Sequence, residues 1–226
     1  MGHMDRVCML IAALAPLAAT IFSLVYGLKY FFKKGKPLCV QSVTMAMASH
    51  ALGTIYQLCL TLTSDNVIEG FTPAYLGRIG FFLFILTAGY GQLDKIVDDG
   101  SSKMRYARIL ALIAPLLAAL LYIPNALIQD VATATKVVYA LVWIPGIISV
   151  YFNLKHIIIP DLDFGFIKAI KPYNFFVLLL SFSELLCLTS WNYYHPILMI
   201  GAAIAFSAFC ICTMVAARKG VEKWTV

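Results

Sequence analysis

Seven apolar stretches of about membrane-spanning length follow one another along the chain, with short polar connections between them. They cover residues 8–28, 38–62, 74–93, 107–128, 134–154, 173–191 and 196–217. A helix needs about 20 mainly apolar residues to cross the roughly 30 Å hydrocarbon layer of a bilayer, and membrane helices tolerate the glycines and prolines found inside these stretches. The pattern predicts an all-α integral membrane protein with seven transmembrane helices, surrounded by the lipid bilayer.

The composition supports this reading and excludes a soluble one. Hydrophobic residues make up 62% of the chain and charged residues 12%, about half the charged fraction of a soluble domain. So little polar surface could not cover a soluble fold, and we expect a single transmembrane domain over residues 1–226, with residues 1–4 read as a cloning remnant. The net charge of +6 does not indicate nucleic-acid binding, because the basic residues lie in short connections and not on one polar face.

The lysines and arginines divide unequally between the two ends of the predicted helices. Three of them, Arg6, Arg78 and Lys136, belong to one end. The other 14 belong to the opposite end: Lys29, Lys33, Lys34, Lys36, Lys95, Lys103, Arg105, Arg108, Lys155, Lys168, Lys171, Arg218, Lys219 and Lys223. Because cytosolic loops are rich in Lys and Arg, the N-terminus is predicted outside and the C-terminus in the cytosol, in the plasma membrane. The longest cytosolic connection, residues 155–172, is expected to lie along the membrane interface.

The first three and the last three predicted helices share sequence features in the same order. These are Lys36-Pro37 and Lys171-Pro172 at the start of the second and sixth helices, Pro73 and Pro196 before the third and seventh, and Pro16 and Pro145 inside the first and fifth. Corresponding helices point the same way. The pattern fits a parallel duplication of residues 8–93 and 134–217 with 107–128 as a linking helix. Chance is the alternative, since proline is common at helix starts.

This three-plus-one-plus-three arrangement resembles the seven-helix carriers of the SWEET sugar-efflux family and their PQ-loop relatives. The resemblance covers the topology of the whole chain. PQ-loop proteins carry Pro-Gln in the first helix of each repeat, whereas here Pro16 is followed by Leu17 and Pro145 by Gly146. The resemblance implies a carrier whose halves are related by rotation about the membrane normal, with the linking helix outside the repeat. A shared architecture does not by itself establish function.

Two ionisable residues lie deep within predicted helices, where charged groups are costly and often functional. His50 is about 13 residues into the second helix and Glu184 about 12 into the sixth, so both lie roughly 20 Å beyond the cytosolic start. At this shared depth the imidazole and the carboxylate are expected to meet, directly or through one water. The pair could bind a polar solute or relay a proton, or it could be a structural clamp between helices.

Further polar and aromatic residues would complete a solute site around this pair. They are Gln57 in the second helix, Tyr90 in the third, Trp143 in the fifth and Asn192 at the end of the sixth. A polar cavity with aromatic walls suits a small neutral or zwitterionic ligand. The alternative reading of Tyr and Trp residues near helix ends is the aromatic belt at the membrane interface.

The cytosolic end of the third helix carries Gln92, Asp94, Asp98 and Asp99. Asp94 and Asp98 are four residues apart and share a helical face, and Asp98-Asp99-Gly100 is a turn signal. We interpret these residues as a gate latch or a contact for a partner protein, with a solvated helix end as the alternative. No metal site is expected, because three acids in one loop lack ligand spacing such as that of an EF-hand.

Motifs for nucleotide binding, metalloprotease chemistry and serine hydrolysis are missing from the sequence. No cofactor is expected, and an enzyme is the least favoured class because His50 and Glu184 lack a third catalytic group. Two hypotheses remain. One is a carrier for a small polar metabolite, and the other is a seven-helix sensor or receptor that signals through cytosolic loops or a partner. A homo-oligomer or a complex with another membrane protein is compatible with both.

Overall fold

The computed structural model describes residues 3–32, 38–63, 71–94, 97–123, 133–159, 166–193 and 196–224. Within these ranges the chain is helical and contains no strand. Seven helices are long and apolar enough to cross a membrane, and each coincides with one of the seven apolar stretches. The prediction of an all-α chain with seven such helices is confirmed.

Two of the seven spans are built from more than one helical segment. In chain order the segments are α1 (His3–Phe31), α2 (Leu38–Thr63), α3 (Pro73–Leu86), η1 (Thr87–Asp94), η2 (Ser102–Met104), α5 (Arg105–Leu110), α6 (Ile113–Ile123), α7 (Thr133–Ile158), α8 (Phe166–Tyr193) and α9 (Pro196–Trp224). The third span is α3 continued by η1, a π-helix. The fourth span is formed by η2, α5 and α6.

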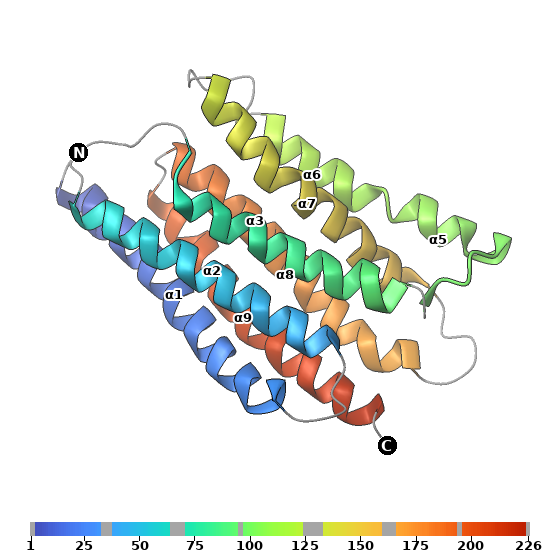
Figure 1. The fold of residues 1–226 in the computed structure, drawn as a ribbon. Helices are drawn as coiled ribbons and strands as arrows, with labels where there is room; N and C mark the ends of the chain where they lie inside the picture. The colour runs from blue at the N-terminus through green and yellow to red at the C-terminus, as the bar shows by residue number, and fades with distance from the viewer. Residues whose placement is uncertain are drawn as a thin grey trace.

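Six helices form a closed ring (Figure 1). Going round it, α1 packs against α2, α2 against α3, α3 against α7, α7 against α8, α8 against α9, and α9 against α1. α6 lies outside the ring, against α7 and α8. The chain termini lie at opposite ends of the bundle. We call the end where α1 begins the N-terminal end, and the end where α9 finishes the C-terminal end.

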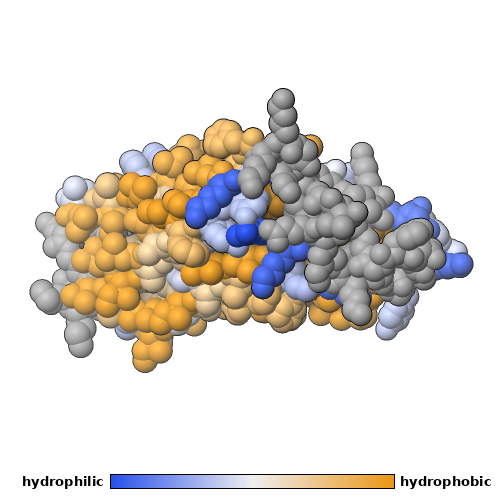
Figure 2. All heavy atoms as spheres, turned by 90° about the horizontal axis from the view of Figure 1, so that it is seen from below, coloured by the Kyte–Doolittle hydropathy of each residue, from blue (hydrophilic) through white to orange (hydrophobic). Residues whose placement is uncertain are grey.

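The outer surface of the bundle is apolar. Large hydrophobic side chains such as Phe22, Leu52 and Leu116 are more than half exposed. On the face shown in Figure 2, hydrophobic residues cover much of the described surface and hydrophilic residues gather toward one end. Soluble proteins rarely expose so extended an apolar surface. The seven apolar helices are therefore compatible with a polytopic membrane protein, and they suggest a lipid bilayer as its environment.

The fourth span differs from the continuous helix expected over 107–128. It begins earlier, at Ser102, and is interrupted at Ala111 and Leu112 between α5 and α6. Pro115 explains the interruption, because a proline has no N–H to donate to the Ala111 carbonyl four residues earlier and its ring clashes there. The described part of this span ends at Ile123, and residues 124–128 of the expected helix lie outside the described residues.

The expectation of an interfacial segment over 155–172 is wrong for the described part of that segment. α7 continues to Ile158, and α8 already begins at Phe166, so that Pro172 lies inside α8 and not at its start. Ile159 and Ile170 are fully buried. They pack in a small cluster with Val97, Met104 and Ala107. These apolar residues therefore hold the fourth, fifth and sixth spans together at the C-terminal end.

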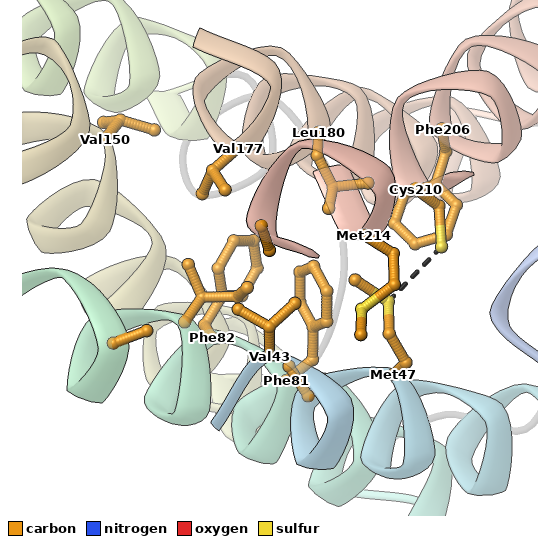
Figure 3. Packing of buried hydrophobic residues seen from close by; sticks show 14 of the residues in the cluster. Val43, Met47, Phe81, Phe82, Val150, Val177, Leu180, Phe206, Cys210 and Met214 are labelled. Carbon is orange, nitrogen blue, oxygen red and sulfur yellow. Dashed lines mark hydrogen bonds between the residues drawn. The ribbon is translucent and has the colours of Figure 1, made fainter. Parts of the chain in front are cut away.

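A dense apolar core fills the centre of the ring (Figure 3). Its side chains point toward one another from α2, α3, α8 and α9, and they include Val43, Met47, Phe81, Phe82, Val177, Leu180, Phe206, Cys210 and Met214. The Cys210 thiol donates to the sulfur of Met47 at 3.3 Å. Phe81, Phe82, Phe206 and Met47 are among the largest fully buried side chains.

Two glycines allow α2 and α3 to cross in direct backbone contact. A Cβ atom added to Gly77 would lie 2.5 Å from the Cα of Gly53, and one added to Gly53 would lie 2.8 Å from the Ala74 carbonyl. The Ser49 hydroxyl donates to the Gly77 carbonyl at 3.0 Å across the same crossing. Small residues permit such close approach between membrane helices. The crossing fixes the depth of residue 78 relative to residue 50.

Candidate functional site

His50 and Glu184 meet inside the bundle. The Nε2 atom of His50 lies 3.1 Å from Oε2 of Glu184, and both residues are almost completely buried. The imidazole stacks on Phe206 with ring centroids 4.4 Å apart and meets the edge of Phe81 at 5.3 Å. The contact predicted from the similar depth of the two residues is confirmed, while its role remains a prediction.

The other nitrogen of His50 faces a hydroxyl. Its Nδ1 atom lies 3.2 Å from Oγ1 of Thr54, and the same hydroxyl lies 2.9 Å from the backbone carbonyl of His50. A threonine hydroxyl has one hydrogen to donate. When Thr54 donates it to the carbonyl, Nδ1 must carry a proton that it donates to Thr54. When Thr54 donates it to Nδ1, that nitrogen carries none. Thr54 thus accommodates His50 in two protonation states.

Arg78 is the third member of this cluster, and it was not predicted. Its Nε atom lies 3.3 Å from Oε1 of Glu184. The sequence pattern grouped Arg78 with the basic residues at one end of the predicted helices. It lies on the second turn of α3, and its side chain is directed inward to Glu184. Its side chain is 14% exposed. The Oε1 atom of Glu184 is buried and, apart from this ion pair, has no hydrogen bond within the described residues.

A small cavity adjoins the three charged residues. It is lined by Ala12, Ala13, Pro16, His50, Thr54, Gln57, Arg78, Glu184, Cys187, Ser190, Met199 and Ala203. Its volume is about 20 Å³, enough for one or two water molecules. Apart from His50, which lies at the middle of α2, the residues that line it come from the half of each helix nearer the N-terminal end. One wall is charged and polar, and the other is formed by small apolar side chains and methionine.

The remaining predicted ligand residues are not all brought to this cavity. Gln57 lines it. Trp143 lies elsewhere: it is buried and donates its indole N–H to the Ala118 carbonyl of α6 at 3.1 Å. Tyr90 is 58% exposed in η1 and packs against Phe152. Asn192 lies in the last turn of α8, and its side chain is outside the described residues.

A second charged cluster lies at the C-terminal end of the bundle. The ammonium group of Lys155 forms an ion pair with Asp94 and lies 3.1 Å from Asp98. His156 Nε2 lies 3.0 Å from Asp94, and its Nδ1 lies 3.4 Å from the side-chain oxygen of Asn174. Lys155 and His156 are buried, although the sequence placed them at the membrane interface. The cluster joins η1 to α7 and α8.

Asp98 extends this cluster to the fourth span. Its carboxylate receives hydrogen bonds from Nε of Arg108 at 2.8 Å and from the Nη2 atom of Arg108 at 2.6 Å. It also accepts the N–H of Gly100, whose positive φ of 80° suits a residue without a side chain. Asp99 is exposed and accepts the N–H of Ser101. Gln92 lies in η1, but its side chain is outside the described residues.

The two carboxylates that form the ion pairs of this cluster, those of Asp94 and Asp98, stay charged to low pH. Hydrogen bonds from Arg108 lower the pKa of Asp98 far below its ordinary value. Burial on its own would raise the pKa of Asp94, but hydrogen bonds from His156 and Lys155 outweigh it and lower that pKa. The Ser101 N–H lowers the pKa of Asp99.

Among the described residues, no group of His, Cys, Asp and Glu side chains could hold a metal ion.

The third span connects the two charged clusters through the apolar core. Arg78 near its start reaches the cavity, Phe81 and Phe82 lie in the core, and Asp94 at its end belongs to the second cluster. At 1.5 Å per residue, Arg78 and Asp94 are about 24 Å apart along the helix. The bundle therefore has three levels: a polar cavity, an apolar plug, and a network of ion pairs.

No family model, curated protein or solved structure matches this chain. The resemblance to SWEET and PQ-loop carriers therefore stays an expectation drawn from the sequence.

Proposed function

We propose that the protein is a membrane carrier for a small polar solute, which binds in the cavity beside His50, Arg78 and Glu184. The observation that carries this proposal is a buried cluster of three ionisable side chains adjoining a cavity at membrane depth. Such residues are expensive to place in a bilayer, and they commonly mark solute or proton pathways. A purely structural clamp would not require a cavity beside the Glu184 carboxylate.

The closure of the opposite half of the bundle supports a carrier. On the side of the cavity that faces the C-terminal end, the ring is filled by the plug of Phe81, Phe82 and Phe206. Nearer the C-terminal end, the ion pairs of Asp94 and Asp98 close the ring. Carriers bind their solute near the middle of the membrane and expose it to one side at a time. The structure corresponds, in this proposal, to the state closed toward the C-terminal end.

The ring order is what a parallel duplication would generate. If α1, α2 and α3 correspond to α7, α8 and α9, a twofold rotation exchanges the α3–α7 contact with the α9–α1 contact. The rotation also exchanges α2 with α8, the helices that carry His50 and Glu184. α6 stays outside the ring, as expected for a linking helix. These relations support the proposed half-repeat.

We assign the N-terminal end to the outside and the C-terminal end to the cytosol. With Arg78 inside the bundle, Arg6 and Lys136 are the two basic residues left on the side proposed to be outside. The 14 on the other side include Arg108 and Lys155, which join the second cluster. The excess of basic residues on that side supports this orientation. The ion-pair network would then be a cytosolic gate.

A sensor is the second candidate function. The observation that favours it is the size of the cavity, which is large enough for water but too small for a metabolite in this conformation. In a sensor, a ligand or proton bound near Glu184 would change the contacts of Asp94 and Asp98 without crossing the membrane. The two functions differ in one measurable property, net transfer of a solute.

Uptake into proteoliposomes tests the proposed function. Purified protein would be reconstituted and offered radiolabelled amino acids, monocarboxylates, amines and sugars, one class at a time. The carrier proposal predicts saturable uptake of one class, which is lost in Glu184→Leu and kept in Asp99→Asn. If no class enters above the level of empty liposomes, while binding to the protein is measurable, the sensor is the better account.

A further inference from the structure

The charges around the cavity can be counted for each protonation state. Within the described residues that line it, the ionisable groups are His50 from α2, Arg78 from α3, and Glu184 and Cys187 from α8. α1 and α9 contribute only apolar side chains to the cavity, and the thiol of Cys210 on α9 is buried but does not line it. The thiols are neutral, so three residues set the charge.

The addition of one proton changes the summed charge of His50, Arg78 and Glu184 from zero to +1. With His50 neutral and donating from Nε2, the charges of Arg78 and Glu184 cancel. With a second proton on His50, donated from Nδ1 to Thr54, the carboxylate balances only one of two cations. The result is the same if that proton rests on Glu184, because Arg78 then remains unbalanced. Thr54 accepts or donates as each state requires.

An unbalanced charge in the interior of a membrane protein is strongly unfavourable. The protonated state therefore requires an anion, and the deprotonated state disfavours one. Arg78 has donors to offer such an anion: a guanidinium carries five N–H groups, and its one described ion pair uses Nε. Carboxylates match the planar guanidinium in a bidentate manner. The opposite wall, formed by Ala12, Ala13 and Met199, suits a short apolar group.

We propose that the cavity, in a conformation wider than the one described here, binds a small monocarboxylate together with one proton, with Arg78 holding the carboxylate and the His50–Glu184 pair holding the proton. This proposal rests on the proposed function and names its solute class. One proton enters with each anion, so the loaded site carries the same net charge as the empty, deprotonated one. A dicarboxylate or a cation would leave the site charged, and a neutral solute would not need the proton.

Binding can be measured on the purified full-length protein by titration calorimetry. Lactate, alanine and lactamide have nearly the same shape and carry one negative charge, no net charge as a zwitterion, and no charge. The proposal predicts that lactate binds and that the other two bind at least about tenfold more weakly. The dissociation constant of lactate should rise about tenfold per pH unit once the pH is high enough for the empty site to lose its proton. Calorimetry in two buffers of different ionisation enthalpy should show uptake of one proton per lactate.

The variant Glu184→Gln tests whether anion binding at the cavity depends on the bound proton. The amide cannot balance Arg78, so the site is cationic with His50 neutral, and lactate should bind with an affinity that no longer changes with pH. The matched exchange Asp99→Asn, on an exposed residue, should keep the wild-type pH dependence. Lactate binding to the wild-type protein without proton uptake, or a Glu184→Gln variant that keeps the pH dependence, would overturn the proposal.

The proposal and the carrier function fail in different ways. If alanine or lactamide binds as tightly as lactate and is taken up into liposomes, the carrier stands and the monocarboxylate is wrong. If lactate binds with a proton but is not taken up, the solute class stands and the carrier function fails.

Discussion

Arg78 and Glu184, on α3 and α8, form an ion pair with 3.3 Å between Nε and Oε1. The Glu184 side chain is 2% exposed and that of Arg78 is 14% exposed. Removal of one partner leaves the other charge uncompensated inside the bundle, which typically costs about 3–5 kcal/mol, whereas replacement of both by apolar residues is often nearly neutral. The pair therefore makes a prediction about single and double variants.

We expect Arg78→Leu and Glu184→Leu each to lower the thermal stability of the purified protein, and the double variant to be less destabilised than the sum of the two. The difference between that sum and the loss in the double variant is the coupling between the two residues, which side chains in direct contact show. Thermal unfolding in detergent would measure it. Strictly additive effects would show that the two side chains do not interact.

The crossing of α2 and α3 predicts a large effect of a single methyl group. In Gly77→Ala the new Cβ would meet the backbone of Gly53 at 2.5–2.7 Å, and neither backbone can move aside without separating the helices. Overpacking of this kind costs about 1–3 kcal/mol. Gly201→Ala is the matched control, because nothing lies within 4 Å of a Cβ at that helical position. The control should unfold at the wild-type temperature or above it, and equal behaviour of the two variants would contradict the close crossing.

The ion-pair network predicts different effects for two neighbouring acids. Asp98→Asn weakens the hydrogen bonds of a charged acceptor to Arg108 and Lys155 and should destabilise the protein by about 1–3 kcal/mol. Asp99→Asn changes an exposed residue and should have almost no effect. Equal stability of Asp98→Asn and the wild type would mean that the network does not hold this end of the bundle.

The same network predicts how stability depends on pH. The pKa values of Asp94 and Asp98 are lowered in the folded protein. Their contribution is therefore fully present above the unfolded pKa, about 4, and is lost only as the pH falls through the lower folded pKa values. We expect the network to stay intact at neutral pH and stability to fall below about pH 4. In Asp98→Asn this acid-dependent loss should be smaller, and a loss as large as that of the wild type would assign it to other groups.

Trp143 provides a test of the helix outside the ring. Trp143→Phe removes the hydrogen bond to the Ala118 carbonyl, which links α7 to α6. Stability should fall by about 1 kcal/mol, while binding at the cavity should not change because Trp143 does not line it. Loss of solute binding without loss of stability would show that Trp143 contributes to the solute site.

The sequence predicted what depends on local composition. Seven apolar stretches predicted seven helices, since length and hydropathy decide whether a helix can span a bilayer. The contact of His50 with Glu184 was also predictable, because depth follows from position along a helix. Rotation about the helix axis was not, and for this reason Trp143 was assigned to the ligand site although it faces α6. Helices that are apolar on all sides give no pattern from which rotation can be read.

The partner of Glu184 on α3 was missed for a related reason. Arg78 lies close to the end of an apolar stretch, and there a basic residue usually faces the lipid headgroups. The glycine before it, Gly77, was the available signal, because a small residue next to an ionisable one permits a helix crossing at that depth. The burial of Lys155 and His156 could not be inferred in the same way. It depends on α7 continuing to Ile158 and on η1 turning Asp94 toward it.

The most direct test of the central claim uses a cysteine that already lines the cavity. In a chain that keeps Cys187 and has its other five cysteines replaced, an impermeant thiol reagent should reach the cavity from the side of the N-terminal end, and not from the side of the C-terminal end. Adding Asp98→Asn, which weakens the network, should reduce labelling from the first side and produce labelling from the second, whereas Asp99→Asn should change neither. Labelling that stays on one side in all three proteins would contradict a carrier with alternating access.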